Sequence, residues 1–239
     1  MTRAAAGPPH LQPRTVSWRN ALRWYEDALR LVKRAPFTWA MLAVLTLAAE
    51  LLLQVVPDFG PMLAKLVVPL VACGMLYAAE AIDRGGTPTV GCAFTAFTAA
   101  PAAIATIIAT SLLSFAAGEA AGWWIADANL LAVDANDDLT MAAFMGIYAI
   151  GILASLPLTF VPFHLLFERV APGAAIVASW RGFIGNTAPL LVYAAASLVL
   201  LGFGIATMGL GLVFALPLWA ASSYAAWKDI FGVDEAAAD

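Results

Sequence analysis

The sequence predicts an all-α polytopic membrane protein with six transmembrane helices, and three observations carry this prediction. Of the 239 residues, 62% are hydrophobic and 12% are charged, whereas a soluble domain is nearer half apolar and a quarter charged. Six apolar runs are long enough to cross the hydrocarbon core as helices. Because these runs are continuously apolar and do not alternate, they exclude a transmembrane barrel.

The N-terminal region divides into two segments. Residues 1–14 are rich in proline and lack periodicity, so we expect a disordered tail. Between Ser17 and Arg34, apolar residues recur at helical spacing while the basic residues fall largely elsewhere, which predicts an amphipathic helix over about 17–34. Its basic face suits the surface of an anionic leaflet. Packing across the base of the helix bundle is the alternative interpretation, and the two are compatible.

One membrane domain is expected over residues 15–232, followed by a short C-terminal tail, 233–239. The predicted spans cover 36–56, 62–82, about 99–123, 141–167, 189–206 and 210–227. The fourth contains Pro157 and Pro162, which predict a kink.

The basic residues predict the orientation of the spans. Seven of the twelve lysines and arginines lie in the first 34 residues. Four more lie on the same side of the membrane as this segment, in the connections between spans or at the C-terminal end: Arg84, Arg169, Arg181 and Lys228. Lys65 is the exception. Because basic residues concentrate on the cytoplasmic side of bacterial membranes, we expect an inner-membrane protein with both termini in the cytoplasm. The opposite side carries an acidic loop over residues 125–139.

Three similar units follow one another along the chain. Each consists of a short amphipathic stretch, an Ala-Pro pair, a hairpin of two spans and a charged end, with the Ala-Pro pairs ending at Pro36, Pro101 and Pro189. Proline suits the first turn of a helix, where its missing N–H costs nothing. All three units enter from the same side, so the pattern predicts three parallel repeats, an arrangement also found in some transporters.

Several short motifs resemble a family of uncharacterised proteobacterial inner-membrane proteins. The motifs are the Pro36-x-x-Trp39 start, the Pro57-x-x-Gly60 turn, the 185–191 stretch Gly-Asn-Thr-Ala-Pro-Leu-Leu, the Pro217 helix and the 223–232 ending Ser-Tyr-Ala-Ala-Trp-Lys-Asp-Ile-Phe-Gly. The resemblance covers most of residues 20 to 232. It implies about six spans and an inner-membrane location, and it implies no activity.

Charged groups inside apolar runs are the first candidates for function, because burying a charge in lipid is expensive. Glu50 and Lys65 lie at similar distances from the Pro57–Pro61 turn, so we expect them to face each other. An ion pair that sets the register of the hairpin is one interpretation. A polar lining for a solute or proton path is the other.

Glu80, His164 and Glu168 are the remaining candidates, near the cytoplasmic boundary of the second and fourth spans. His164 and Glu168 share a helix face at i, i+4 spacing. A hydrogen-bonded interfacial histidine and a proton relay are both open, whereas a metal site needs more ligands than this pair supplies.

The sequence contains no recognisable catalytic motif. We therefore expect no catalytic residue, cofactor or metal, and a non-enzymatic protein that acts by helix packing or by contact with a membrane-protein partner. The other expected partners are the lipid bilayer and anionic lipids at the amphipathic helix, and nucleic acid is not expected. A small-solute transporter or channel built on the threefold repeat is the alternative.

Overall fold

The computed structural model describes residues 11–126 and 140–233, and within these ranges the regular structure is entirely helical. The predicted tails (1–10 and 234–239) and most of the acidic loop (127–139) lie outside the described residues. The elements are α1 (Asn20–Arg34), α2 (Pro36–Gln54), α3 (Gly60–Asp83), the 3₁₀ helix η2 (Val90–Thr98), α4 (Pro101–Ala126), α5 (Met141–Ser155), the 3₁₀ turn η3 (Leu156–Leu158), α6 (Val161–Leu166), α7 (Pro172–Gly185), α8 (Thr187–Ala206) and α9 (Leu212–Phe231).

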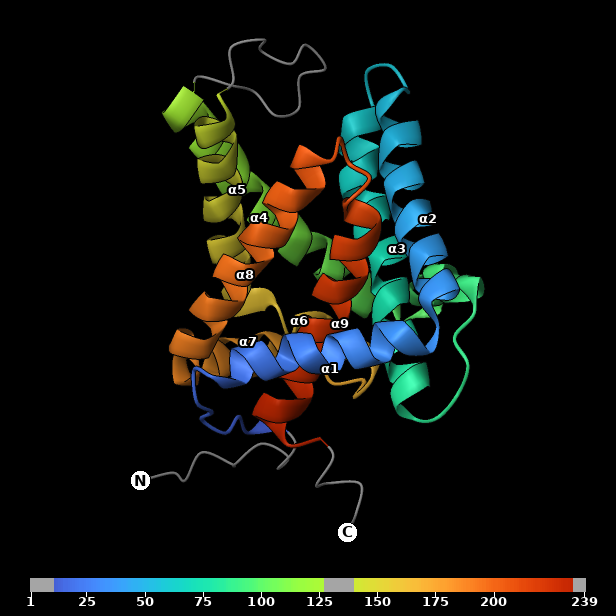
Figure 1. Ribbon diagram of the computed structural model, residues 1–239, viewed down its shortest axis with the longest axis vertical. Coiled ribbons are helices and arrows are strands. Elements are labelled where there is room, and N and C mark those ends of the chain that lie inside the picture. Colours follow the sequence, from blue (N-terminus) through green and yellow to red (C-terminus); the bar gives the residue numbers. More distant parts are fainter. Residues whose placement is uncertain (1–10, 127–139, 234–239) are drawn as a thin grey trace.

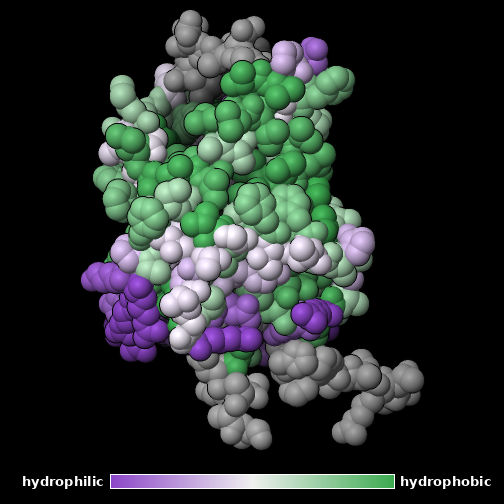
Figure 2. Space-filling view, turned by 90° about the vertical axis from the view of Figure 1, so that its right-hand side faces the viewer, coloured by the Kyte–Doolittle hydropathy of each residue, from purple (hydrophilic) through white to green (hydrophobic). Residues whose placement is uncertain are grey.

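Five stretches of helix are long and apolar enough to span a membrane, which makes this a membrane protein. They are α2, α3, α4, the α5–α6 stretch and α8. A green apolar band covers the upper part of the face in Figure 2, and hydrophilic residues gather at the lower end. The expected sixth span corresponds to α9, which has 20 residues but is less apolar than the other five because it contains Ser222, Ser223, Lys228 and Asp229.

Helix α9 forms the centre of the bundle. It packs against α1, α2, α3 and α8, and Figure 1 shows it among them. Ser222 and Ser223 are buried, and each donates a hydrogen bond to a carbonyl of the preceding turn, that of Trp219 and Ala220 respectively. Protein surrounds this part of α9, so its polar side chains need not face lipid.

Helix α1 lies across one end of the bundle, nearly perpendicular to α2 and α3 (Figure 1). We call this end of the molecule the α1 end. The helix buries Ala21, Trp24, Ala28 and Leu31. On the neighbouring flank Trp18, Leu22 and Leu29 remain 52%, 55% and 43% exposed. Packing across the bundle therefore uses one side of α1 and leaves an apolar flank free for lipid.

The fourth span is broken, as Pro157 and Pro162 predicted. Helix α5 ends at Ser155, and α6 begins at Val161 after the turn η3. Proline frees backbone groups that lipid cannot satisfy. The fully buried Ser179 of α7 supplies partners here: its hydroxyl accepts from the N–H of Phe160 (3.1 Å) and donates to the carbonyl of Pro157 (2.7 Å).

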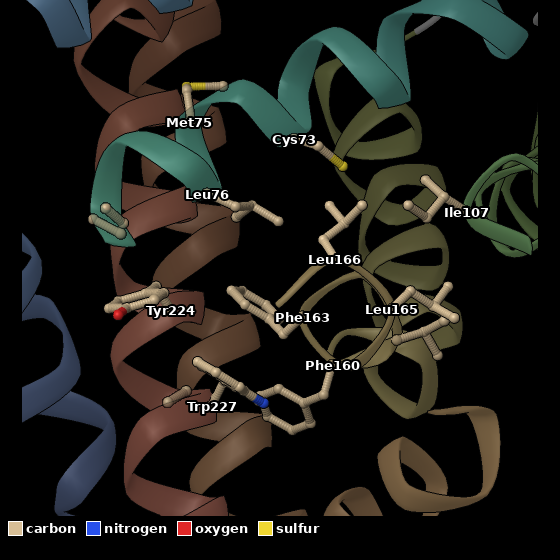
Figure 3. Packing of buried hydrophobic residues seen from close by; sticks show 14 of the residues in the cluster. Cys73, Met75, Leu76, Ile107, Phe160, Phe163, Leu165, Leu166, Tyr224 and Trp227 are labelled. Atoms are coloured by element: carbon tan, nitrogen blue, oxygen red, sulfur yellow. The ribbon is translucent and has the colours of Figure 1, made fainter. Parts of the chain in front are cut away.

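A cluster of buried aromatic rings joins α6 to α9. The rings of Phe163 and Trp227 stack with centroids 5.3 Å apart, and Phe160 meets Phe231 edge to face at 5.5 Å. Figure 3 shows Phe160 and Phe163 on their side of the cluster, facing Trp227 of α9. Such contacts add to the stabilisation from apolar burial, and they fill the interior near the α1 end.

The chain enters the bundle before α1 begins. Leu11 is only 9% exposed, and the N–H of Arg14 donates to the carbonyl of Ile230 in α9 (2.7 Å). Residues 11–14, which the sequence analysis assigned to the tail, are thus in contact with α9. This segment is ordered because Arg14 forms hydrogen bonds with residues more than 170 positions away, and the local composition of the segment does not reveal them.

Candidate functional site

Glu50 and Lys65 form the expected ion pair between α2 and α3. Lys65 Nζ lies 2.6 Å from Glu50 Oε1. The lysine side chain is 24% exposed and the glutamate side chain is 26% exposed. Gln54 donates a second hydrogen bond to the same carboxylate oxygen (2.7 Å). The ammonium group also lies 5.2 Å from the centre of the Phe115 ring of α4, within reach of a cation–π interaction. The pair joins three spans.

Glu80 lies at the other end of α3. Its carboxylate is 2.8 Å from the guanidinium of Arg84, one turn further along, and it is the more buried of the two at 18% exposure. Fifteen residues separate it from Lys65, which corresponds to roughly 22 Å along a helix. Glu80 therefore belongs to a different level of the molecule from the Glu50–Lys65 pair.

His164 and Glu168 form a third pair. His164 is fully buried, and its Nδ1 lies 2.7 Å from Glu168 Oε2. The other ring nitrogen, Nε2, has no hydrogen-bond partner. The ring of Phe231 meets the imidazole edge to face with centroids 4.5 Å apart. Within the part of the chain that the structure describes, the His164 side chain has one polar contact, the Glu168 carboxylate, and aromatic rings pack around it.

The five predicted residues do not form one site: Glu50 pairs with Lys65, His164 pairs with Glu168, and Glu80 pairs with Arg84, which was not predicted. Within the described residues, no group of three or more histidine, cysteine, aspartate or glutamate side chains is placed to hold a metal ion. The described contacts contain no hydrogen bond from one of these pairs to another. Each of these carboxylates has a local partner, which favours a structural role for all three pairs.

A polar network at the α1 end was not predicted. Asp229, near the end of α9, accepts hydrogen bonds from Asn20 (2.8 Å) and from the indole of Trp24 (2.9 Å) through Oδ2. Its Oδ1 lies 3.2 Å from the guanidinium of Arg14. One carboxylate therefore fastens both α1 and the segment before it to the central helix.

Two more residues complete this network. Asp83, at the end of α3, accepts from the phenol of Tyr224 (3.0 Å) and from Lys228 (2.5 Å). The buried amide of Asn186 accepts from the N–H of Val16 (2.8 Å) and donates to the carbonyl of Arg14 (3.0 Å). These contacts close the α1 end around α9.

A cavity of about 520 Å³ opens beside this network, under α1. Its charged lining combines three carboxylates with five basic side chains: Asp27, Asp83, Asp229, Arg14, Arg23, Arg30, Arg34 and Lys228. All three carboxylates have basic partners, since Asp27 pairs with Arg30 at 2.9 Å. The lining therefore carries an excess of positive charge, as the basic N-terminal segment predicted.

Tyr25 of α1 reaches into the bundle toward α8. Its hydroxyl donates to the carbonyl of Tyr193 (3.1 Å) and lies 2.9 Å from the hydroxyl of Ser197. Burial raises the pKa of the Tyr25 phenol above its usual value, and hydrogen bonds with Ser197 and Ser222 oppose that shift. The phenol is therefore a neutral hydrogen-bonding group at physiological pH.

No family model, curated protein or solved structure matches this chain. The resemblance to proteobacterial inner-membrane proteins therefore stays a prediction. Of the residues in its motifs, Asn186, Tyr224, Trp227 and Asp229 lie within or beside the polar and aromatic clusters at the α1 end.

Proposed function

We propose that the chain is a six-span integral protein of the bacterial inner membrane with both termini in the cytoplasm. The length of α9, 20 residues, supports a sixth crossing, and burial among α1, α2, α3 and α8 explains how it tolerates polar side chains. The excess of basic residues at the α1 end supports the orientation. The bacterial assignment depends on the motif resemblance described above.

We also propose that three parallel repeats build the bundle. The order of elements supports this: a short helix (α1, η2 or α7) precedes each pair of spanning segments. The pairs are α2–α3, α4 with α5–α6, and α8–α9. In each pair the second member contains proline, at Pro69, at Pro157 and Pro162, and at Pro217.

The role that the geometry supports best is non-enzymatic: the protein binds anionic lipid and a membrane-protein partner at its α1 end. The observation that carries this proposal is the separation of the five predicted polar residues into local contacts, with aromatic packing around His164. A transport path needs polar groups that a solute or proton can reach in succession. An excess of positive charge lies instead at the α1 end, part of it on the surface of α1.

Lipid binding by α1 follows from its two exposed sides. Trp18, Leu22 and Leu29 supply an apolar flank, and Arg19 and Lys33 border it along the helix. Basic residues near an anionic leaflet contribute roughly 1 kcal/mol each. Spin labels on the flank should therefore report lipid, and labels at Arg23 and Arg30 should report water.

The experiment that tests the role combines reconstitution with purification. Proteoliposomes should show no proton or solute flux beyond that of empty liposomes. Purification from native membranes in mild detergent should retain a membrane protein that is lost when Arg23 and Arg30 are both changed to glutamate. A matched double change of Thr106 and Thr110 to valine, on α4, should retain it. Flux that Glu50→Gln abolishes would contradict the proposal.

Transport is the second candidate, and one observation favours it. A cavity of about 280 Å³ lies between α3, η3, α8 and α9, close to the interior prolines Pro69 and Pro217. Ser155, Thr159 and Tyr193 add hydroxyl groups to its largely apolar lining. Broken helices around a midplane cavity are a known plan for substrate sites in transporters.

A further inference from the structure

A second cavity at the α1 end has a polar side and an apolar side. It has a volume of about 710 Å³ and lies between the end of α3, η2, the first turn of α4 and the segment after α6. Its polar lining consists of charged and hydroxyl-bearing side chains: Glu80, Arg84, Arg169, Tyr77, Thr95 and Thr98. Its apolar lining includes Ala102, Ala103, Leu165, Leu166 and Val170. A ligand that fills it must itself be amphipathic.

The charges of this cavity do not cancel. Glu80 forms an ion pair with Arg84, with 2.8 Å between carboxylate and guanidinium. Arg169 also lines the cavity, and in the described part of the chain no hydrogen bond or ion pair involves its side chain. Arg169 therefore adds a positive charge to a lining that also contains the Arg84 guanidinium, which is 74% exposed. Two arginines in this arrangement suit a phosphate group.

The backbone of Arg169 supplies an independent observation. Its φ of 54° lies in the left-handed region, which costs energy for a residue other than glycine. The preceding residue, Glu168, is held by the buried His164 (2.7 Å), and the N–H of Val170 donates to the carbonyl of His164 (3.2 Å). The chain around α6 thus holds Arg169 in a strained conformation at the cavity.

We propose that this cavity binds one anionic phospholipid, with its phosphate between Arg84 and Arg169 and an acyl chain along the α4–α6 side. The proposal rests on the membrane placement given above, because it requires the α1 end to lie at headgroup level. Basic pockets between spanning helices on the cytoplasmic side are known to hold anionic headgroups. The apolar half of the lining favours a lipid over free phosphate.

Native mass spectrometry of the full chain in mild detergent tests this proposal. Phosphatidylglycerol and phosphatidylcholine are titrated separately, and inorganic phosphate is added as a competitor. The wild type should retain one phosphatidylglycerol in preference to phosphatidylcholine, and inorganic phosphate should not displace it. Arg169→Gln should weaken phosphatidylglycerol binding about fivefold, and Arg169→Lys should restore most of it.

Two further variants separate binding from folding. Arg169→Gly removes the side chain and relieves the left-handed backbone, so it should raise the melting temperature and still weaken phosphatidylglycerol binding. Arg181→Gln removes an exposed charge from α7 at the same end, and it should leave binding unchanged. Unaltered binding in Arg169→Gly, an equal loss in Arg181→Gln, equal retention of both lipids, or displacement by inorganic phosphate would each overturn the proposal. Extraction of the wild type from membranes by alkaline carbonate would instead refute the membrane placement.

Discussion

The Glu50–Lys65 pair makes the sharpest prediction about the stability of this protein. Glu50 lies four residues before the end of α2, and Lys65 lies five residues after the start of α3. At 1.5 Å per residue the two groups lie roughly 6–8 Å inside the hairpin end. Three variants test the pair. Glu50→Gln removes the negative charge, Lys65→Met removes the positive charge, and the double variant removes both.

The magnitudes follow from what each variant leaves behind. In Lys65→Met the Glu50 carboxylate keeps only the hydrogen bond from Gln54, so we expect a loss of about 2 kcal/mol in the free energy of unfolding. In Glu50→Gln the ammonium keeps the ring of Phe115 and can extend toward the hairpin end of the two helices, so the loss should be about 1 kcal/mol. The double variant strands no charge and should also lose about 1 kcal/mol.

The assay is reversible unfolding in detergent micelles, with all four proteins measured under one set of conditions. The expected coupling energy between the two positions is about 2 kcal/mol, within the range found for contacting residues. The combination of Thr106→Val with Lys65→Met is the control, and its losses should be additive, because the Thr106 hydroxyl donates to the carbonyl of Ala102 in its own helix whereas Lys65 contacts Glu50 and Phe115. Additive losses for the Glu50 and Lys65 variants would refute the reasoning.

Two further predictions concern packing and pH. Gly74→Ala should cost about 2 kcal/mol in the free energy of unfolding, because the new methyl carbon would lie 2.4 Å from the Cα of Ala93. In Gly118→Ala the new methyl carbon meets no atom within 4 Å, so this variant should be neutral or stabilising. Thermal melting of both variants tests this difference, and equal losses would contradict it. The raised pKa of Tyr25 means that the unfolded phenol ionises first, so the contribution of this phenol to stability should be constant below pH 10.0 and fall as pH rises above it. Tyr25→Phe should lower stability by about 1 kcal/mol at neutral pH and weaken the alkaline decline, and an unchanged decline would show that the Tyr25 phenol does not cause it.

The amino-acid sequence by itself determined the class of this protein and most of its helices. Composition and run length predict spanning helices because the energetic cost of leaving backbone groups unpaired in lipid does not depend on the details of packing. The pairing of Glu50 with Lys65 was also predictable, since a short turn forces two helices to be antiparallel neighbours and equal counting sets both side chains at one depth. Pro157 and Pro162 predicted the break in the fourth span for an equally local reason.

Only the tertiary structure decided how the α1 end is built. Asp229 reads in the sequence as part of a charged helix end, but in the fold it accepts hydrogen bonds from Asn20 and Trp24, more than 200 positions away. Ser179 gives no local signal that it satisfies the backbone at the break between α5 and α6. The placement of Arg169 and Arg84 in the lining of one cavity likewise depends on how α3 and the segment after α6 meet. Side chains that form hydrogen bonds with distant backbone and polar groups leave no periodic pattern in the sequence, because those groups become buried only when the helices pack.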